Sequence, residues 1–282
     1  MKKTLVAIFI YCIIFGTILE PMSNFLKHEE KRDVSEKIEP AVFEALKVSE
    51  TARVIIVFNS NADKNRILHK YALSGIDLWI INGFATVLSR EQVLELAKED
   101  AVSFIYLSKQ IRLTFHQKII DLPLQIPFNE KIDNNWRERL GINLLEGIGI
   151  TGEGITVAVI DSGIDSSHPD LADAVIYEES FVDYNFDGVI DEDARDYVGH
   201  GTHVAGIIAG RGVASAGKIK GVASKAKLWN LKAFAKDGSS YDAWLIAAIQ
   251  KAVESDDVSI ISMSFGGIES VSYTHLTLPT KA

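Results

Sequence analysis

The chain has 282 residues, a formal net charge of −9 and 47% apolar residues, enough for two domains with buried cores. This acidic balance argues against nucleic acid or an acidic membrane surface as a partner. The single cysteine, Cys12, lies near the amino end and leaves the rest of the chain without a disulfide framework or a thiol nucleophile.

The first 22 residues are predicted to be a signal segment. Lys2 and Lys3 precede a largely apolar run from Leu5 to Leu19, the order of a basic region and an apolar core. The protein is therefore expected to be secreted, or extracellular. The run is long for a signal and short for a membrane span, and no clean small-residue cleavage site follows it. Anchoring in a membrane by residues 4–19 remains the alternative.

A small domain is predicted over residues 50–110. Residues 27–50 are charged and are expected to form a linker with one short amphipathic helix. The pattern that follows predicts strand, helix, strand pair or long strand, helix and strand. These elements are expected at 53–58, 63–73, 77–88, 91–98 and 102–107. Their order is that of the ferredoxin-like split motif, strand-helix-strand-strand-helix-strand.

A second domain begins after a connecting segment. Residues 122–128, with two prolines, are expected to be extended, and 136–145 to form a helix leading into the next domain. The β-branched, apolar run Ile155–Ile160 predicts a parallel strand covered on both faces. It ends at Asp161, and the carboxyl ends of strands are where sites form in open α/β sheets.

An acidic segment, residues 183–193, follows that strand. Oxygen ligands at alternate positions, then a glycine, resemble the first half of a calcium-binding loop. The twelfth position, where such a loop carries a bidentate glutamate, is Ala194. We predict a structural calcium site here, and an acidic turn held by Asx hydrogen bonds is the alternative. The expected ligands are Asp183, Asn185, Asp187, Val189 through its carbonyl, and Asp191.

His200 lies between two glycines and begins a run in which Val204 and Ile207 recur at helical spacing. The small residues between them predict a helix that is buried on all sides, with His203 as a packed core residue. The dipole at the first turn disfavours imidazolium, so His200 would need a carboxylate partner in order to accept a proton. Asp161 is the expected partner. A buried ion pair without chemistry is the alternative.

The remaining elements alternate between strand and helix. A strand is predicted at 228–234, a helix with one apolar face at 241–254 and a buried strand at 258–264. Strands that alternate with helices favour an α/β fold, in which helices cover both faces of a parallel sheet.

Three motifs resemble those of the subtilases, the subtilisin-like serine proteases, in the family's order and near its spacing. They are Asp161-Ser162-Gly163, His200-Gly201-Thr202-His203-Val204-Ala205-Gly206 and Ser262-Met263-Ser264-Phe265-Gly266-Gly267. The resemblance covers residues from about 50 to 270. It implies an incomplete subtilisin-like parallel sheet, preceded by a ferredoxin-like propeptide domain that acts as chaperone and inhibitor of its own protease. It also implies an Asp-His-Ser triad in which Asp161 orients and His200 acts as general base.

The same resemblance implies where a peptide substrate would bind. The turn Lys236–Ser240 resembles the family's edge segment, which pairs with an extended peptide through main-chain hydrogen bonds. The glycine pair after the last strand resembles one wall of the pocket for the residue before the scissile bond. Ordinary turns are the alternative for both. The residues expected to contact substrate are Gly238, Ser239, Ser240, Ser264, Phe265, Gly266 and Gly267.

The family's nucleophile, a serine in a Gly-Thr-Ser-Met-Ala turn, and the asparagine before it are absent from this sequence. The tail 271–282 resembles the translation of a sequencing adapter, so we expect a precursor that is cut off before the catalytic serine. The predicted parts are a signal segment (1–22), a propeptide domain (50–110), a linker with the processing region (111–140), a partial catalytic domain (141–270) and a non-native tail (271–282).

The expected partners are a peptide or protein substrate and the chain's own propeptide, and a membrane only through an uncleaved amino-terminal segment. Cleavage of the propeptide is expected between Lys109 and Asn135. A binding protein of a different class, with a propeptide-like inhibitor on a catalytically dead shell, is the alternative.

Overall fold

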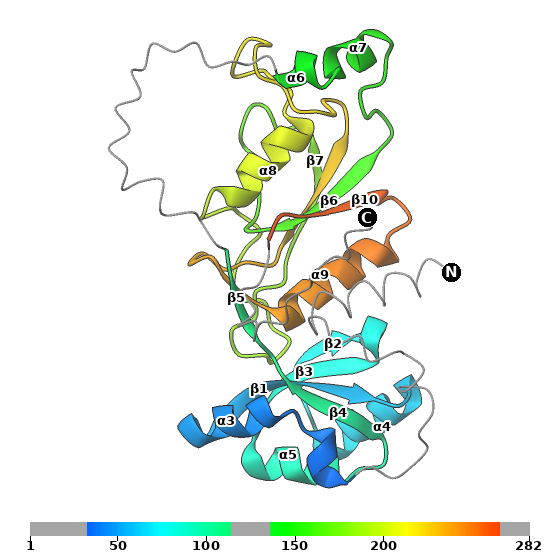
Figure 1. The fold of residues 1–282 in the computed structure, drawn as a ribbon, viewed down its shortest axis with the longest axis vertical. Coiled ribbons are helices and arrows are strands. Elements are labelled where there is room, and N and C mark those ends of the chain that lie inside the picture. Colours follow the sequence, from blue (N-terminus) through cyan, green and yellow to red (C-terminus); the bar gives the residue numbers. More distant parts are fainter. Residues whose placement is uncertain (1–32, 114–135, 266–282) are drawn as a thin grey trace, which may run out of the picture.

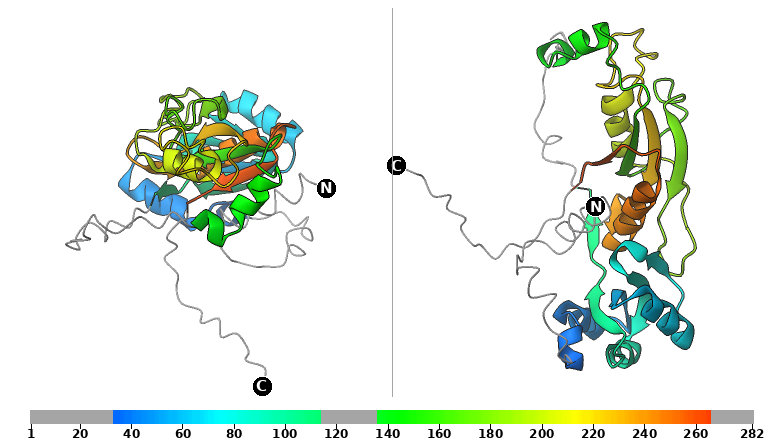
Figure 2. Two further views of the ribbon diagram at one scale, coloured as in Figure 1. Left: turned by 90° about the horizontal axis from the view of Figure 1, so that it is seen from above. Right: turned by 90° about the vertical axis from the view of Figure 1, so that its right-hand side faces the viewer.

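The computed structural model describes residues 33–113 and 136–265, which form a smaller first unit and a larger second unit (Figure 1). The first unit and the helices α6 (Trp136–Arg139) and α7 (Ile142–Gly147) lie at opposite ends of the molecule (Figure 2). The predicted signal segment, most of the predicted processing region and the predicted tail lie outside the described residues. Within the described ranges, no helix is both long and apolar enough to cross a membrane.

The first unit has the strand-helix-strand-strand-helix-strand order that the sequence pattern predicts. Its elements are β1 (Thr51–Phe58), α4 (Asn61–Tyr71), β2 (Ile76–Leu78), the 3-10 helix η2 (Trp79–Ile81), β3 (Gly83–Ser89), α5 (Arg90–Ala97) and β4 (Val102–Leu107). The four strands form an antiparallel sheet in the order β2-β3-β1-β4. Of the two alternatives predicted for 77–88, a strand pair or one long strand, the structure has the pair, separated by a 3-10 turn.

Residues 34–48, which the sequence analysis assigns to a linker, are part of the core of the first unit. They form η1 (Val34–Lys37) and α3 (Pro40–Val48), and α3 contacts β1 and β4. Ile38 and Val42 are fully buried in the same cluster as Ile105 of β4. The charged residues of α3, Glu44 and Lys47, are exposed, whereas its inner face is apolar.

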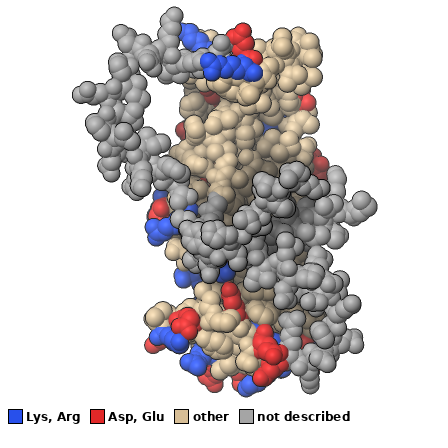
Figure 3. Space-filling view, viewed as in Figure 1, with Lys and Arg blue, Asp and Glu red and all other residues tan. Residues whose placement is uncertain are grey.

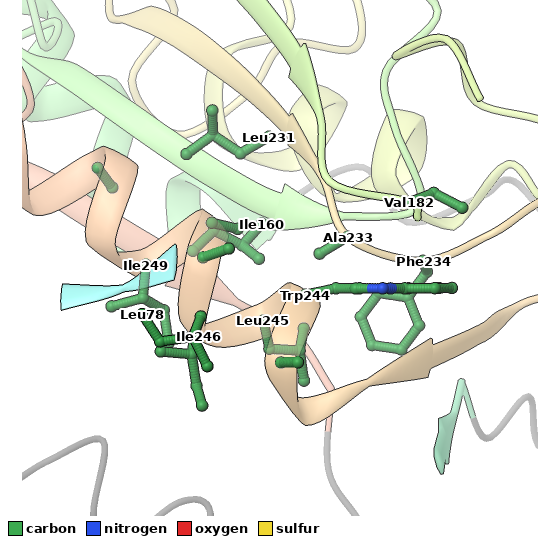
Figure 4. Packing of buried hydrophobic residues seen from close by; sticks show 14 of the residues in the cluster. Leu78, Ile160, Val182, Leu231, Ala233, Phe234, Trp244, Leu245, Ile246 and Ile249 are labelled. Carbon is green, nitrogen blue, oxygen red and sulfur yellow. The ribbon is translucent and has the colours of Figure 1, made fainter. Parts of the chain in front are cut away.

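The sheet of the first unit is buried on both faces. Side chains alternate along β1, so that Val54 and Ile56 pack in the core formed with the first unit's own helices. Ile55 and Val57 belong to a different cluster, shared with the second unit. In that cluster Leu78 of β2 lies beside Ile246 and Ile249 (Figure 4). The second unit therefore covers the face of this sheet that the first unit's helices leave open.

The second unit is the predicted α/β structure. Its further elements are β6 (Thr156–Asp161), β7 (Val175–Ser180), α8 (His200–Ala209), β8 (Lys227–Lys232), α9 (Asp242–Glu254) and β10 (Ile260–Met263). The strands form a parallel sheet in the order β10-β6-β8-β7. Helices cover both faces, because alternate residues of β6 pack with α8 on one side and with α9 on the other.

Three details differ from the sequence predictions. Helix α8 is buried on one face only, through Gly201, Ala205 and Ala209, whereas His203 is exposed, so its assignment to the core was wrong. The small residues of α8 therefore allow one close contact and do not mean that the helix is buried on all sides. The predicted helix 136–145 is two helices that separate at Gly141, whose φ is +71°. Strand β7 was not predicted, because its glutamates resemble a charged loop.

Candidate active site

Asp161 and His200 meet at the carboxyl end of the parallel sheet. Asp161 is the last residue of β6 and is 1% exposed, and His200 is the first residue of α8. The distance between His200 Nδ1 and Asp161 Oδ1 is 2.7 Å. The strand and the helix that the sequence places 39 residues apart thus bring the two predicted side chains into direct contact.

Two glycines allow this close approach. A Cβ atom at Gly201 would lie 2.1 Å from the carbonyl oxygen of Gly163, a separation that atoms cannot adopt. Gly163 itself has a φ of +109°, a conformation that side chains disfavour. The first turn of α8 can therefore rest directly on the end of β6, which sets the position of the imidazole above the carboxylate.

The contact between the two side chains defines the chemistry available to the imidazole. Asp161 Oδ1 also accepts a hydrogen bond of 2.7 Å from the backbone N–H of Ser162, which orients the carboxylate. A carboxylate beside Nδ1 holds the proton on that nitrogen and makes Nε2 the proton-accepting one. It also stabilises the imidazolium that forms when Nε2 takes up a proton. This geometry would allow the imidazole to accept a proton at Nε2, which is what a general base requires.

Asp196 fixes the start of α8 and was not singled out for this role from the sequence. Its Oδ2 accepts hydrogen bonds from the backbone N–H and the hydroxyl of Thr202, and its Oδ1 accepts from Gly199 N–H and from the Ser162 hydroxyl. Burial acts to raise the pKa of Asp196, but these hydrogen bonds outweigh it and the pKa is lowered. The usual capping signal was absent from the sequence, because the N-cap of α8 is Gly199 and Asp196 lies four residues before the helix.

Lys232 supports the site from the end of β8, and the sequence analysis missed it. The side chain is fully buried, and its Nζ donates a hydrogen bond of 2.7 Å to the carbonyl of Ser162, next to Asp161. The Glu192 carboxylate lies 3.6 Å from the same ammonium. Burial lowers the pKa of Lys232 and the neighbouring carboxylates oppose that shift. The available signal was a lysine that ends a strand with the apolar residues Leu228, Trp229 and Leu231.

The acidic loop 183–193 holds its own backbone with its carboxylates. Asp183 accepts a hydrogen bond from Gly188 N–H, Asp187 from Val189 N–H and Asp191 from Tyr184 N–H. In the two described ranges there is no group of three or more His, Cys, Asp or Glu side chains placed to hold a metal ion. The bond from Val189 N–H to Asp187 is of the Asx type that the alternative interpretation expects, and calcium binding at this loop remains a prediction.

The predicted substrate edge is paired with a strand of the chain itself. Strand β5 (Gln110–Arg112) runs antiparallel to β9 (Ser239–Tyr241), and a hydrogen bond of 2.9 Å joins Leu113 N–H to the carbonyl of Gly238. The Ser240 hydroxyl donates inward to the carbonyl of Ala233, which leaves the backbone of β9 to form the edge. An extended peptide therefore occupies this edge.

The last predicted substrate residues are only partly described. Ser264 is exposed, and the ring of Phe265 lies 5.1 Å from that of Phe234, centroid to centroid. Gly266 and Gly267 lie outside the described residues. The structure therefore places the beginning of the predicted pocket wall beside the end of β8.

Comparisons with known proteins agree on a family. Residues 152–277 match the Subtilase family. The major intracellular serine protease of Bacillus subtilis (strain 168) is 47% identical over 120 residues, which are 42% of this chain and 36% of that protein. Subtilisin E of the same strain is 33% identical over 187 residues, which are 66% of this chain and 42% of that protein. The chain thus spans less than half the length of these two relatives.

Among solved structures, the epidermin leader peptide processing serine protease of Staphylococcus aureus is similar in fold. The TM-score is 0.59 at 20% sequence identity, over 76% of this chain and 50% of that chain. At this level of identity the similarity extends to the fold alone.

Proposed function

We propose that the chain is part of a serine endopeptidase precursor, because its residues 152–277 match the Subtilase family. The observation that carries the proposal is the 2.7 Å contact between His200 Nδ1 and Asp161 Oδ1 at the carboxyl end of β6. In this proposal His200 removes the proton from a serine hydroxyl as the hydroxyl attacks a peptide carbonyl, and returns it to the leaving amine. Asp161 holds the imidazole and stabilises its charged form.

The attacking serine is proposed to come from sequence beyond the described residues of a longer protein. Ser262 belongs to β10 and Ser264 follows it directly, and neither lies in the Gly-Thr-Ser turn that the family uses. The matched residues span 36% and 42% of the lengths of the two relatives.

We further propose that the first unit is a propeptide that inhibits the second. Two observations support this role: β5 occupies the predicted substrate edge β9, and the open face of the first unit's sheet packs on the second unit. A substrate would bind the same edge after β5 leaves, through the backbone of Gly238, Ser239 and Ser240. Secretion through residues 1–22 and membrane anchoring through residues 4–19 are both compatible with this arrangement.

The assignment of His200 is tested by substitution in the longer protein that carries the serine. His200→Ala is expected to lower peptide hydrolysis at least about a thousandfold and to stop release of the first unit, because the general base is lost. His203→Ala is the matched control, since His203 is exposed one turn further along α8 and should leave activity unchanged. Retained self-processing in His200→Ala would refute the assignment. A folded longer protein that hydrolyses no peptide would favour the dead-shell alternative.

A further inference from the structure

Arg53 extends from the first unit into an aromatic slot of the second. It lies on the same face of β1 as the apolar Ile55 and Val57. The apolar packing of that face does not explain why an arginine is present there. Its Nη2 donates a hydrogen bond of 2.9 Å to the carbonyl of Tyr184. The guanidinium carbon lies 5.6 Å from the ring centroid of Phe186 and 5.2 Å from that of Tyr241. We call Tyr184, Phe186 and Tyr241 the arginine slot.

The second unit holds the arginine slot in place, although one residue of the slot has a strained backbone conformation. Phe186 is buried with a φ of +54°, an unusual conformation for a bulky residue that only its surroundings can impose. Its ring packs edge-to-face against Tyr241 at 5.3 Å. Trp244 of α9 contacts Tyr241 at 5.0 Å, and its indole N–H donates to the carbonyl of Asp183, at the start of the loop. The position of the slot is therefore set by α9.

The same loop touches the first unit at a second point. A Cβ atom at Gly188 would lie 2.9 Å from the carbonyl oxygen of Gly75, which follows α4 in the first unit. The backbones of the two units thus approach so closely that a side chain at Gly188 has no room. Loop 183–193 contacts the first unit through Tyr184 and Phe186 near its beginning and through Gly188 at its middle.

We propose that loop 183–193 is the element by which the second unit recognises its own amino-terminal unit, with the Arg53 guanidinium as the ligand of the arginine slot. The proposal rests on the proposed function, in which the first unit is a propeptide that inhibits the second. A guanidinium fits because it is planar, stacks on aromatic rings and donates to a carbonyl at the same time. Its Nε is buried and finds no hydrogen-bond partner in the described part of the chain, a cost that the ring contacts and the bond to the Tyr184 carbonyl have to outweigh.

The proposal is tested by measuring how tightly the two units hold each other once the chain between them is cut. A recognition sequence for a site-specific protease is inserted between residues 122 and 123 of the whole chain. After cleavage, the dissociation constant of the two fragments is measured by dilution in an analytical ultracentrifuge. Arg53→Ala is expected to raise this constant ten- to a hundredfold, and Arg53→Lys to recover only part of the loss.

Two matched controls separate recognition from general damage. Arg66→Ala also removes an arginine of the first unit, but Arg66 is exposed on α4 and pairs with Asp63, so the constant should not change. Gly188→Ala should weaken binding, whereas Gly217→Ala, with a similar φ of +84° and open space around it, should not. Circular dichroism of the uncut variants shows whether each one folds, and Phe186→Leu tests the slot from the second unit's side.

Unchanged binding in a folded Arg53→Ala variant, or equal weakening by Gly217→Ala and Gly188→Ala, would overturn the proposal. So would wild-type fragments that separate on cleavage. No hydrolysis is measured, so any of these results leaves the roles of Asp161 and His200 untouched. Conversely, activity in the His200→Ala variant of the longer protein would remove the peptidase assignment without affecting the measured binding of the units.

Discussion

At the scale of single residues, Gly201 determines how closely His200 approaches Asp161. The carbonyl of Gly163 occupies the space that any side chain at Gly201 would need. The Asp161 Cβ would also lie only 3.1 Å from such an added atom. In this fold, the first turn of α8 can therefore approach the end of β6 this closely only because residue 201 is glycine.

Gly201→Ala is expected to destabilise the fold by about 2–4 kcal/mol, because α8 must move away from β6 or overlap with it. Urea unfolding of the 282-residue chain measures this change. Gly206→Ala in the same helix is the control, since nothing lies within 4 Å of an added Cβ there. It should stabilise the helix by about 0.5–1 kcal/mol. Similar effects of the two substitutions would show that the contact with Gly163 is not limiting.

At the scale of elements, the start of α9 is where the first unit's last strands join the second unit. The Asp242 carboxylate accepts hydrogen bonds from the Ser108 hydroxyl, from Lys109 N–H and from Ala243 N–H. It therefore caps its own helix and holds the segment between β4 and β5 with the same two oxygens. Burial raises the pKa of Asp242 to about 6, although these hydrogen bonds act in the opposite direction.

This raised pKa predicts a loss of stability as the pH rises. The pKa of this carboxyl group is about 6 in the folded state and near 3.8 in the unfolded state. The group therefore stabilises the fold fully below pH 3.8, and this stabilisation is lost as the pH rises through about 6. The lost amount is up to about 3 kcal/mol. The side chain in Asp242→Asn cannot titrate. The unfolding free energy of the wild type, relative to that of this variant, should therefore fall between pH 4 and pH 7. Parallel curves from urea unfolding at several pH values would contradict the expectation.

At the scale of the whole molecule, an apolar cleft lies between α8 and the edge strand β10. It has a volume of about 410 Å³ and is lined mainly by aliphatic side chains, including Ile207, Val222 and Ile260. On the face shown in Figure 3, charged side chains gather toward the two ends of the molecule, and the surface over α8 is mostly uncharged. Edge strands next to exposed apolar surface promote association between chains.

The 282-residue chain is therefore expected to self-associate at micromolar concentrations. Ile260→Lys should shift the distribution toward monomer in sedimentation velocity, because Ile260 is 53% exposed in β10 and a charge there opposes edge-to-edge pairing. Val48→Lys also replaces an exposed aliphatic residue by lysine, but on α3 of the first unit, and should have no such effect. Equal effects of both lysines would point to net charge instead of the cleft.

Much of the fold follows from local patterns. The apolar runs of β1 and β6 and the helical spacing of apolar residues in α9 are visible in short windows of the sequence. The contact between Asp161 and His200 was also predictable, since a carboxylate at a strand end and a histidine at a helix start belong to the same edge of an α/β sheet.

The sequence by itself thus determined the two units, their element order and the pair at the site. Only the tertiary structure decided which faces are covered: that α3 belongs to the first core, that His203 is exposed, and that Lys232 supports the site. It alone also placed Arg53 against Phe186, because contacts between residues more than a hundred positions apart leave no period in the chain. Local sequence patterns follow from the geometry of a single helix or strand. They therefore carry no information about which distant residues come into contact when the chain folds.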